Sequence, residues 1–284
     1  MTAGFEQSES TRFRQEWTQQ RRRDARTAHI AFWMLSCLDN STSPSKPPTL
    51  SKETIRDQLA EFIQRSEPLS ENETPDEIAE NFLESICGRS GPLIEIDGSG
   101  GHYAFVKLAY QEDLAASYIN DQIELRGVEP VWGIIDSLAT KNHWQKVIRL
   151  VMRKLLNPEA QRIQIEKLIP QAPFGEGSFE KALLTVNFYL DGVDGAVVLL
   201  KDILIGFFHS IGPDPDCDLA NRVAQTCKEL RASSPVADRE FVMQLEELCR
   251  NGDSRNKSAW LSLGLAAGLD RETVCGWTGK HTSD

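Results

Sequence analysis

Five histidines are the side chains best suited to acid–base chemistry near neutral pH, and they are dispersed along the chain. None has a serine, cysteine or carboxylate partner at the spacing of a known catalytic motif, and no GxSxG nucleophile elbow occurs. We therefore expect each of them to be a packed or surface side chain, and the sequence predicts no catalytic residue. The five are His29, His102, His143, His209 and His281.

Glycine-rich segments can cradle phosphates, but neither candidate here has the pattern of a Walker A loop. Gly98–Gly101 has no lysine behind it and is predicted to be a hairpin turn. Gly279–Thr282 contains a lysine, but it has no preceding strand and no following helix. No Walker B segment is present either, so we expect the chain alone not to hydrolyse ATP.

Metal-ligand patterns are equally incomplete. The six cysteines form no CxxC pair, which disfavours a zinc site. Asp191–Gly195 and Asp214–Asp218 resemble fragments of calcium loops, but both lack the terminal glutamate of an EF-hand. We expect turns and helix caps there, and no metal or other cofactor bound by this chain alone.

Composition indicates the class of protein. The chain has 284 residues, a formal net charge of −11, 26% charged residues and 40% hydrophobic residues. These values are ordinary for a globular protein, the length allows about two domains or one long array, and the acidic balance disfavours a large nucleic-acid surface. No run of 18 apolar residues suggests a membrane span, and the N-terminal segment lacks the apolar centre of a secretory signal. We therefore expect a cytoplasmic protein with reduced thiols and no membrane partner.

The elements of the first half predict a helical segment over residues 1–40 and a winged-helix-like domain over 45–125. A helix over 11–38 carries a cluster of arginines, which can be a solvated face or a phosphate or acidic-lipid site. A proline-rich linker over 39–49 precedes a helix over 50–64. Thr74, Pro75 and Glu77 are typical of a helix start, and the helix is expected to end at Gly88 or Gly91.

A β-hairpin and a further helix complete that domain. Two β-prone runs, 92–97 and 102–106, flank the glycine turn and predict the hairpin. In the helix expected over 109–123, five side chains should share the buried side, while Glu112, Asp113 and Asn120 should lie mostly on the other. The five are Tyr110, Leu114, Ala115, Tyr118 and Ile119.

The remainder, residues 130–284, is predicted to be an irregular α-α array of the HEAT or armadillo kind. Prolines stand between or at the starts of the expected helices, and no fixed repeat length is visible. The fold class is therefore mainly α, with one β-hairpin. The expected helices are 130–140, 142–156, 158–169, 178–190, 193–209, 216–231, 235–250, 256–268 and 270–277.

One segment carries a family resemblance. Arg89-Ser90-Gly91 with Leu93 and Glu95, followed by a phrase running from Phe105 to Ala116, resembles the signature that closes the winged helix of NACHT-type STAND NTPases. The flanking segments extend the resemblance over about residues 10–150. The phrase is carried by Phe105, Leu108, Tyr110, Gln111, Glu112, Leu114, Ala115 and Ala116.

The resemblance implies a site and a function. Lys107 stands where the family has a histidine that contacts the phosphate of the nucleotide, and Asp113 replaces an aromatic residue. Lys107 can contact phosphate as a point charge, or it can be an ordinary surface lysine. The family membership would make this chain a regulatory portion of a signalling or defence ATPase. ATP or ADP would then bind only with a nucleotide-binding domain of the same or another chain.

Three other functions stay open from the residues themselves. The chain can be a free-standing helical-repeat adaptor that binds a protein partner. It can also be a winged-helix nucleic-acid binder, although the acidic helix after Thr74 disfavours that function. An enzyme with dispersed catalytic residues is the third, and no motif supports it.

Overall fold

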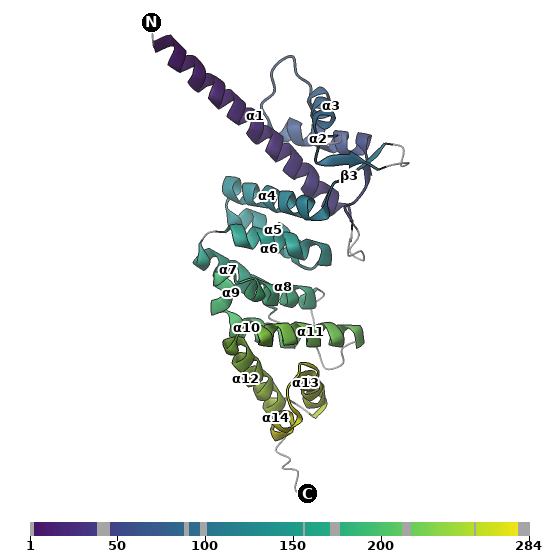
Figure 1. Ribbon diagram of the computed structural model, residues 1–284, viewed down its shortest axis with the longest axis vertical. Helices are drawn as coiled ribbons and strands as arrows, with labels where there is room; N and C mark the ends of the chain where they lie inside the picture. The colour runs from purple at the N-terminus through teal and green to yellow at the C-terminus, as the bar shows by residue number, and fades with distance from the viewer. Residues whose placement is uncertain are drawn as a thin grey trace. The chain divides into compact units, whose positions relative to one another are not determined.

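The computed structural model describes residues 3–38, 46–87, 91–96, 101–155, 157–170, 177–211, 217–252 and 254–277. Side chains are described from residue 18 onward, except those of residues 217 and 254–256 within these ranges. The described chain is mainly helical with one small antiparallel sheet, which confirms the predicted fold class (Figure 1). It divides into two compact units, residues 1–132 and 133–284, and each is described by itself below.

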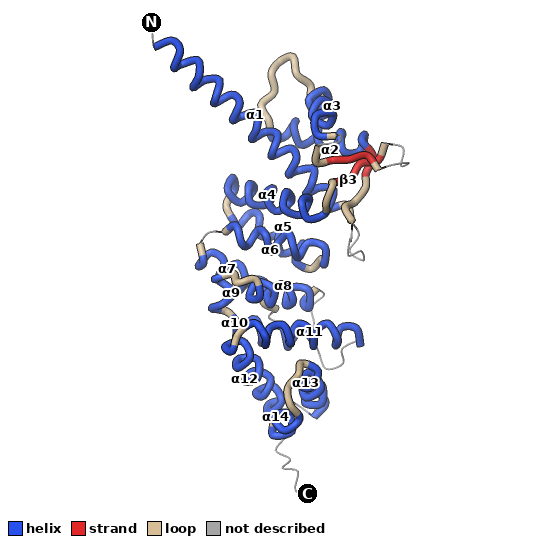
Figure 2. The backbone as a smooth tube through the Cα atoms, viewed as in Figure 1, coloured by secondary structure: helices blue, strands red, loops and turns tan. Residues whose placement is uncertain are grey.

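The first unit has the topology of a winged helix. A helix, a strand and two helices precede a β-hairpin, and the three strands pair antiparallel in the order β1-β3-β2 (Figure 2). A further helix, α4, follows the hairpin directly, as the sequence predicts. The elements are α1 (Ala3–Ser36), β1 (Leu50–Ser51), α2 (Lys52–Ser66), α3 (Pro75–Ile86), β2 (Leu93–Glu95), β3 (His102–Phe105) and α4 (Leu108–Arg126).

Strand β1 differs from the sequence prediction, which begins a helix at Leu50. Leu50 lies opposite Tyr103 of β3 and Ser51 lies opposite His102, so both residues are extended. Helix α2 starts at Lys52 because the Ser51 side chain caps it by accepting a hydrogen bond from the Thr54 amide. A two-residue strand is defined only by its distant partner, and no periodicity reveals it.

Helix α3 begins as predicted and ends close to Gly88, one of its two predicted ends. The Thr74 side chain accepts from the Glu77 amide, and Pro75 occupies the first turn. The helix ends at Ile86, and Gly88 lies outside the described residues. Gly91 passes so close to the Ile86 carbonyl that an added Cβ would lie 1.9 Å from its oxygen. Gly91 is therefore required for close backbone approach, not for ending the helix.

The core of the first unit includes α1. Ile30, Ala31 and Met34 of α1 are buried in the same cluster as residues of α2, α3 and the hairpin. The segments predicted as 1–40 and 45–125 thus contribute to one core. The other buried members are Ile55, Leu59, Ala60, Ile63, Ala79, Phe82, Leu83, Ile86, Leu93 and Phe105.

Helix α4 packs against α1, and this contact changes which face of α4 is buried (Figure 1). The predicted assignment is wrong at two signature positions, since Glu112 is buried whereas Tyr110 is 46% exposed. The buried face turns toward α1, whose position the sequence pattern of α4 alone does not define. The buried residues of α4 are Gln111, Glu112, Ala115, Ala116, Ile119 and Ile123.

The second unit consists of helices in its described part, and successive helices pack against near neighbours in sequence. Asn157, Ser234 and Asp270 cap three of the helices through their side chains. Helix α5 (Val128–Ala139) crosses the boundary between the units. The others are α6 (Gln145–Lys154), α7 (Pro158–Leu168), α8 (Ser178–Leu190), α9 (Asp194–Val198), α10 (Leu200–Ile211), α11 (Cys217–Ser233), α12 (Pro235–Asn251), α13 (Ser254–Ala266) and α14 (Arg271–Gly276), with a 3-10 turn at Asn142–Trp144.

The single helix predicted over 193–209 is wrong, because the chain forms α9 and α10 there with a break at Leu199. Close packing of α9 on α7 accompanies the break. The Gly195 amide donates a hydrogen bond to the buried Gln161 side chain. An added Cβ on Gly195 would lie 2.5 Å from the backbone nitrogen of Arg162. Gln161 also donates to the Leu155 carbonyl at 2.6 Å, so one amide side chain joins three segments of the array.

Candidate functional site

Lys107 lies between β3 and α4, at the position that precedes the first turn of the helix. Its backbone is extended and its side chain is exposed and does not cap the helix. Within the described residues, its ammonium group has no ion pair. The geometry therefore leaves one exposed positive charge at the junction of the hairpin and α4.

The rest of the signature phrase joins elements together. The Gln111 amide nitrogen donates to the Ala31 carbonyl of α1 at 3.2 Å, and both groups are buried. Ala115 and Ala116 are fully buried, and their small side chains permit close approach of the two helices. Phe105 is buried, with the Tyr110 ring 6.4 Å away between centroids. Leu108 and Leu114 are half-buried, and Asp113 is exposed.

The other candidates from the sequence remain apart. His102 and His209 are exposed, His143 is buried, and His281 and Gly279–Thr282 lie outside the described residues. The Asp191 carboxylate is held by both Nε and Nη2 of Arg149 at 2.6 Å, so it belongs to an ion pair. Most of the second acidic run also lies outside the described part. Among the described residues, no three metal-ligating side chains gather closely enough to hold an ion.

The arginine cluster of α1 divides into two kinds of residue. Arg26 makes a two-pronged ion pair with Glu67, with nitrogen–oxygen distances of 2.8 and 2.7 Å, and its guanidinium lies 5.5 Å from the Phe82 ring centroid. Arg26 is therefore occupied in holding α1 to the end of α2. Arg21 and Arg23 are exposed on the same helix.

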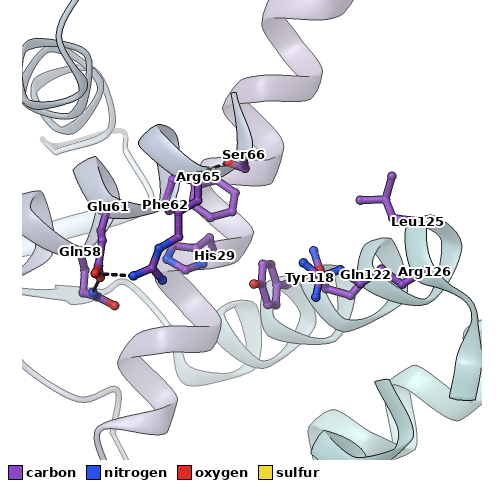
Figure 3. Close-up of a pocket in the computed structure, with 10 residues that line it drawn as sticks. All are labelled: His29, Gln58, Glu61, Phe62, Arg65, Ser66, Tyr118, Gln122, Leu125 and Arg126. Carbon is purple, nitrogen blue, oxygen red and sulfur yellow. Dashed lines mark hydrogen bonds and ion pairs between the residues drawn. The ribbon is translucent and has the colours of Figure 1, made fainter. Parts of the chain in front are cut away.

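A cavity of about 390 Å³ lies between α1, α2 and α4 in the first unit, and the sequence did not predict it (Figure 3). The His29 ring stacks on Phe62, with centroids 4.1 Å apart and an interplanar angle of 14°. Tyr118 meets His29 edge-on at 5.4 Å. Arg65 and Ser66 line the cavity from α2, and Gln122 and Arg126 line it from α4.

Electrostatics in this cavity keep His29 neutral. Burial and, to a smaller extent, the Arg65 guanidinium together lower the pKa of His29 to about 4, with Glu61 partly opposing them. Burial also raises the pKa of Tyr118, while Arg126 opposes that shift. Neither ring nitrogen of His29 has a hydrogen-bond partner within the described residues, although both are buried. A neutral imidazole in a stack is thus the ordinary state of this site.

The cavity residues were missed because no local signal marks them. His29, Phe62 and Tyr118 come from three different helices and share no spacing that a motif search could use. A second hollow of about 650 Å³ adjoins the cavity and shares five lining residues with it, Phe62, Ser66, Tyr118, Gln122 and Leu125. The residues that line both hollows lie within the first unit.

No protein-family model, curated protein or solved structure matches this chain. Within the described part of the chain, none of the helices combines the length and the apolar character needed to cross a membrane.

Proposed function

We propose that this chain is a non-catalytic regulatory portion of a NACHT-type STAND ATPase that acts in signalling or defence. The observation that carries the proposal is the signature phrase on a hairpin that runs directly into α4, within a winged-helix topology. Its buried members, Phe105, Gln111, Ala115 and Ala116, join the hairpin and α4 to the core and to α1. The phrase thus has a physical role in the fold as well as a resemblance.

Lys107 is the residue that would contact nucleotide. Its ammonium group is exposed beside the first turn of α4, where a lysine can meet a phosphate as a point charge. A contact made in one arrangement of the domains and absent in another would bias a two-state equilibrium. The nucleotide itself would be held by a nucleotide-binding domain of the same or another chain in the cytoplasm.

The helices of the second unit would receive the stimulus. Arrays of stacked helices present long surfaces to protein partners. Ile163 of α7 and Val198 of α9 are 39% and 75% exposed on two helices that pack together. A continuous apolar patch formed by such side chains would be typical of a protein-binding surface.

Detection of the natural polypeptide tests the proposal first. An antibody raised against residues 133–284 should detect a band well above 31.8 kDa in the source cell, and that polypeptide should hydrolyse ATP whereas the 284-residue chain should not. A band near 31.8 kDa with no co-purifying ATPase would contradict the proposal.

Nucleotide retention in the purified larger polypeptide or its complex tests Lys107. We expect Lys107→Ala to release bound ADP about tenfold faster in a fluorescent-ADP chase, because one phosphate contact is removed. Lys228→Ala is the matched control, since Lys228 is exposed on α11 with no ion pair among the described residues. Equal release rates in both variants would remove Lys107 from the proposal.

A free-standing adaptor is the second candidate function. The exposed apolar residues of α7 and α9 favour it, because they require no nucleotide-binding domain to act. A natural polypeptide of 31.8 kDa that forms a stable complex with one protein partner would favour this function over the first.

A further inference from the structure

The cavity between α1, α2 and α4 has the size of a small-molecule site. Its volume of about 390 Å³ lies in the range of pockets that enclose such ligands, about 300–1,000 Å³. Its apolar wall is aromatic, since the Phe62 and Tyr118 rings lie 6.5 Å apart between centroids. The two rings meet edge to face, with an interplanar angle of 63°, and His29 contacts both of them. The outer side of this aromatic cluster is a surface on which a flat ring can pack.

The charge of the cavity differs from that of the chain. The ionisable side chains that line it are two arginines, Arg65 and Arg126, one glutamate, Glu61, and the neutral His29 and Tyr118. The lining is thus net positive in a chain of net charge −11. An anion is therefore favoured here over a cation.

Hydrogen-bonding groups in the cavity are open to a ligand. Arg126 makes no ion pair within the described part of the chain, and the Gln122 amide makes no hydrogen bond there. Arg65 donates to Glu61 from its Nη2 atom at 2.5 Å, which leaves other guanidinium donors available. Figure 3 shows Arg65 extending from α2 beside His29, and Gln122 and Arg126 on α4 beyond Tyr118.

We propose that this cavity binds a small planar aromatic anion, with its ring against Phe62 and Tyr118 and its carboxylate or phosphate at Arg126 and Arg65. The neutral His29 belongs to the same aromatic cluster, and the Gln122 amide orients the polar edge of the ligand. Ligand binding here would bridge α2 and α4. The inference concerns a site distinct from Lys107 and does not depend on the proposed ATPase.

Matched probes test the chemical class with the 284-residue chain. Titration calorimetry with 2-naphthoate should give a Kd below about 1 mM, while the neutral 2-naphthamide and the non-aromatic cyclohexanecarboxylate should each bind at least about fivefold more weakly. 2-Naphthyl phosphate distinguishes a phosphate ligand from a carboxylate ligand by which of the two anions binds more tightly. No binding of either naphthyl anion at 5 mM would overturn the proposal, as would equal binding of the neutral amide.

Variants locate the bound anion. Arg126→Gln should weaken naphthoate binding about tenfold, because the exposed arginine loses its charge without disturbing a buried contact. Arg239→Gln is the control, since Arg239 is exposed on α12 with no ion pair among the described residues. The His29 ring signals should shift on titration in an NMR spectrum and serve as a local reporter. Equal weakening by both variants, or unshifted His29 signals, would place the anion elsewhere and overturn the proposal.

Discussion

The imidazole of His29 contacts the rings of Phe62 and Tyr118 and is close to the Arg65 guanidinium. Protonation of His29 therefore adds a second positive charge to a partly buried site. The pKa of His29 is lowered to about 4 from its usual 6.5. Between these values the unfolded chain binds more protons than the folded chain, so stability falls as pH falls from 6.5 to 4. Above pH 6.5 this group has no effect on the pH dependence.

We expect the free energy of opening of the first unit to fall by about 1–2 kcal/mol when the pH is lowered from 7 to 5, because of His29. Hydrogen exchange of residues 18–36 and 52–66, corrected for intrinsic rates, measures it. His29→Phe keeps a flat ring and should remove most of this loss. His209→Gln, at an exposed histidine of the second unit, should leave it unchanged. An undiminished loss in His29→Phe would mean that other groups cause it.

The Arg26–Glu67 ion pair is the second prediction at this scale. The Arg26 side chain is only 14% exposed and the Glu67 side chain only 8%. Removing one charge therefore leaves the other buried without its partner. Glu67→Gln should lower the opening free energy of residues 18–36 by about 1–3 kcal/mol in hydrogen exchange.

Glu61→Gln supplies the comparison for this ion pair on the same helix. Its partner Arg65 is 73% exposed, and ion pairs of that kind contribute under about 1 kcal/mol. If Glu67→Gln cost no more than Glu61→Gln, the Arg26–Glu67 pair would not be what holds α1 to α2.

At the scale of elements, the contact between α1 and α4 depends on small side chains. Ala115 is fully buried on the face of α4 that packs against α1. Ala115→Leu should cost about 1–3 kcal/mol through overpacking, measured as faster hydrogen exchange in both helices. Ala109→Leu adds the same side chain at an exposed position of α4 and should change stability by less than about 0.5 kcal/mol. Equal effects would mean that α4 is not closely packed on α1.

Elements with local signals could be predicted from the sequence. Thr74 and Pro75 define the start of α3, and the runs around the glycine turn define β2 and β3, because caps and alternation are local properties. Features that depend on distant partners could not. Strand β1 exists only by pairing with β3, and the buried position of Glu112 follows from the packing of α1 on α4.

The same distinction separates the two candidate sites. Lys107 lies within a contiguous phrase, so sequence reasoning could single it out, and its exposure agrees with a binding role. The cavity at His29 joins residues of three helices, and each of them alone is an ordinary histidine, phenylalanine or tyrosine. Only the folded first unit brings these rings together.

At the scale of the whole molecule, charge distinguishes this winged helix from those that bind DNA. The chain has a net charge of −11, and α3, the helix before the hairpin, exposes Asp76, Glu77 and Glu84. Glu80 of the same helix pairs with Lys52. A surface that meets the phosphate backbone needs positive charge, because release of counterions drives that binding. Among the side chains of α1 that the structure describes, Arg21 and Arg23 are exposed arginines.

We therefore expect the Kd for a 20-base-pair DNA duplex to exceed about 100 µM at 50 mM salt, as measured by fluorescence anisotropy. Replacing Asp76, Glu77 and Glu84 with lysine should produce binding that weakens steeply with salt, because only the sign of the exposed α3 charges then changes. If the unaltered chain bound the duplex with micromolar affinity and a steep salt dependence, this would contradict the regulatory proposal. It would instead support the function of a nucleic-acid binder. Loss of that affinity in an Arg21→Gln, Arg23→Gln double variant would then locate the binding surface on α1 and not on α3.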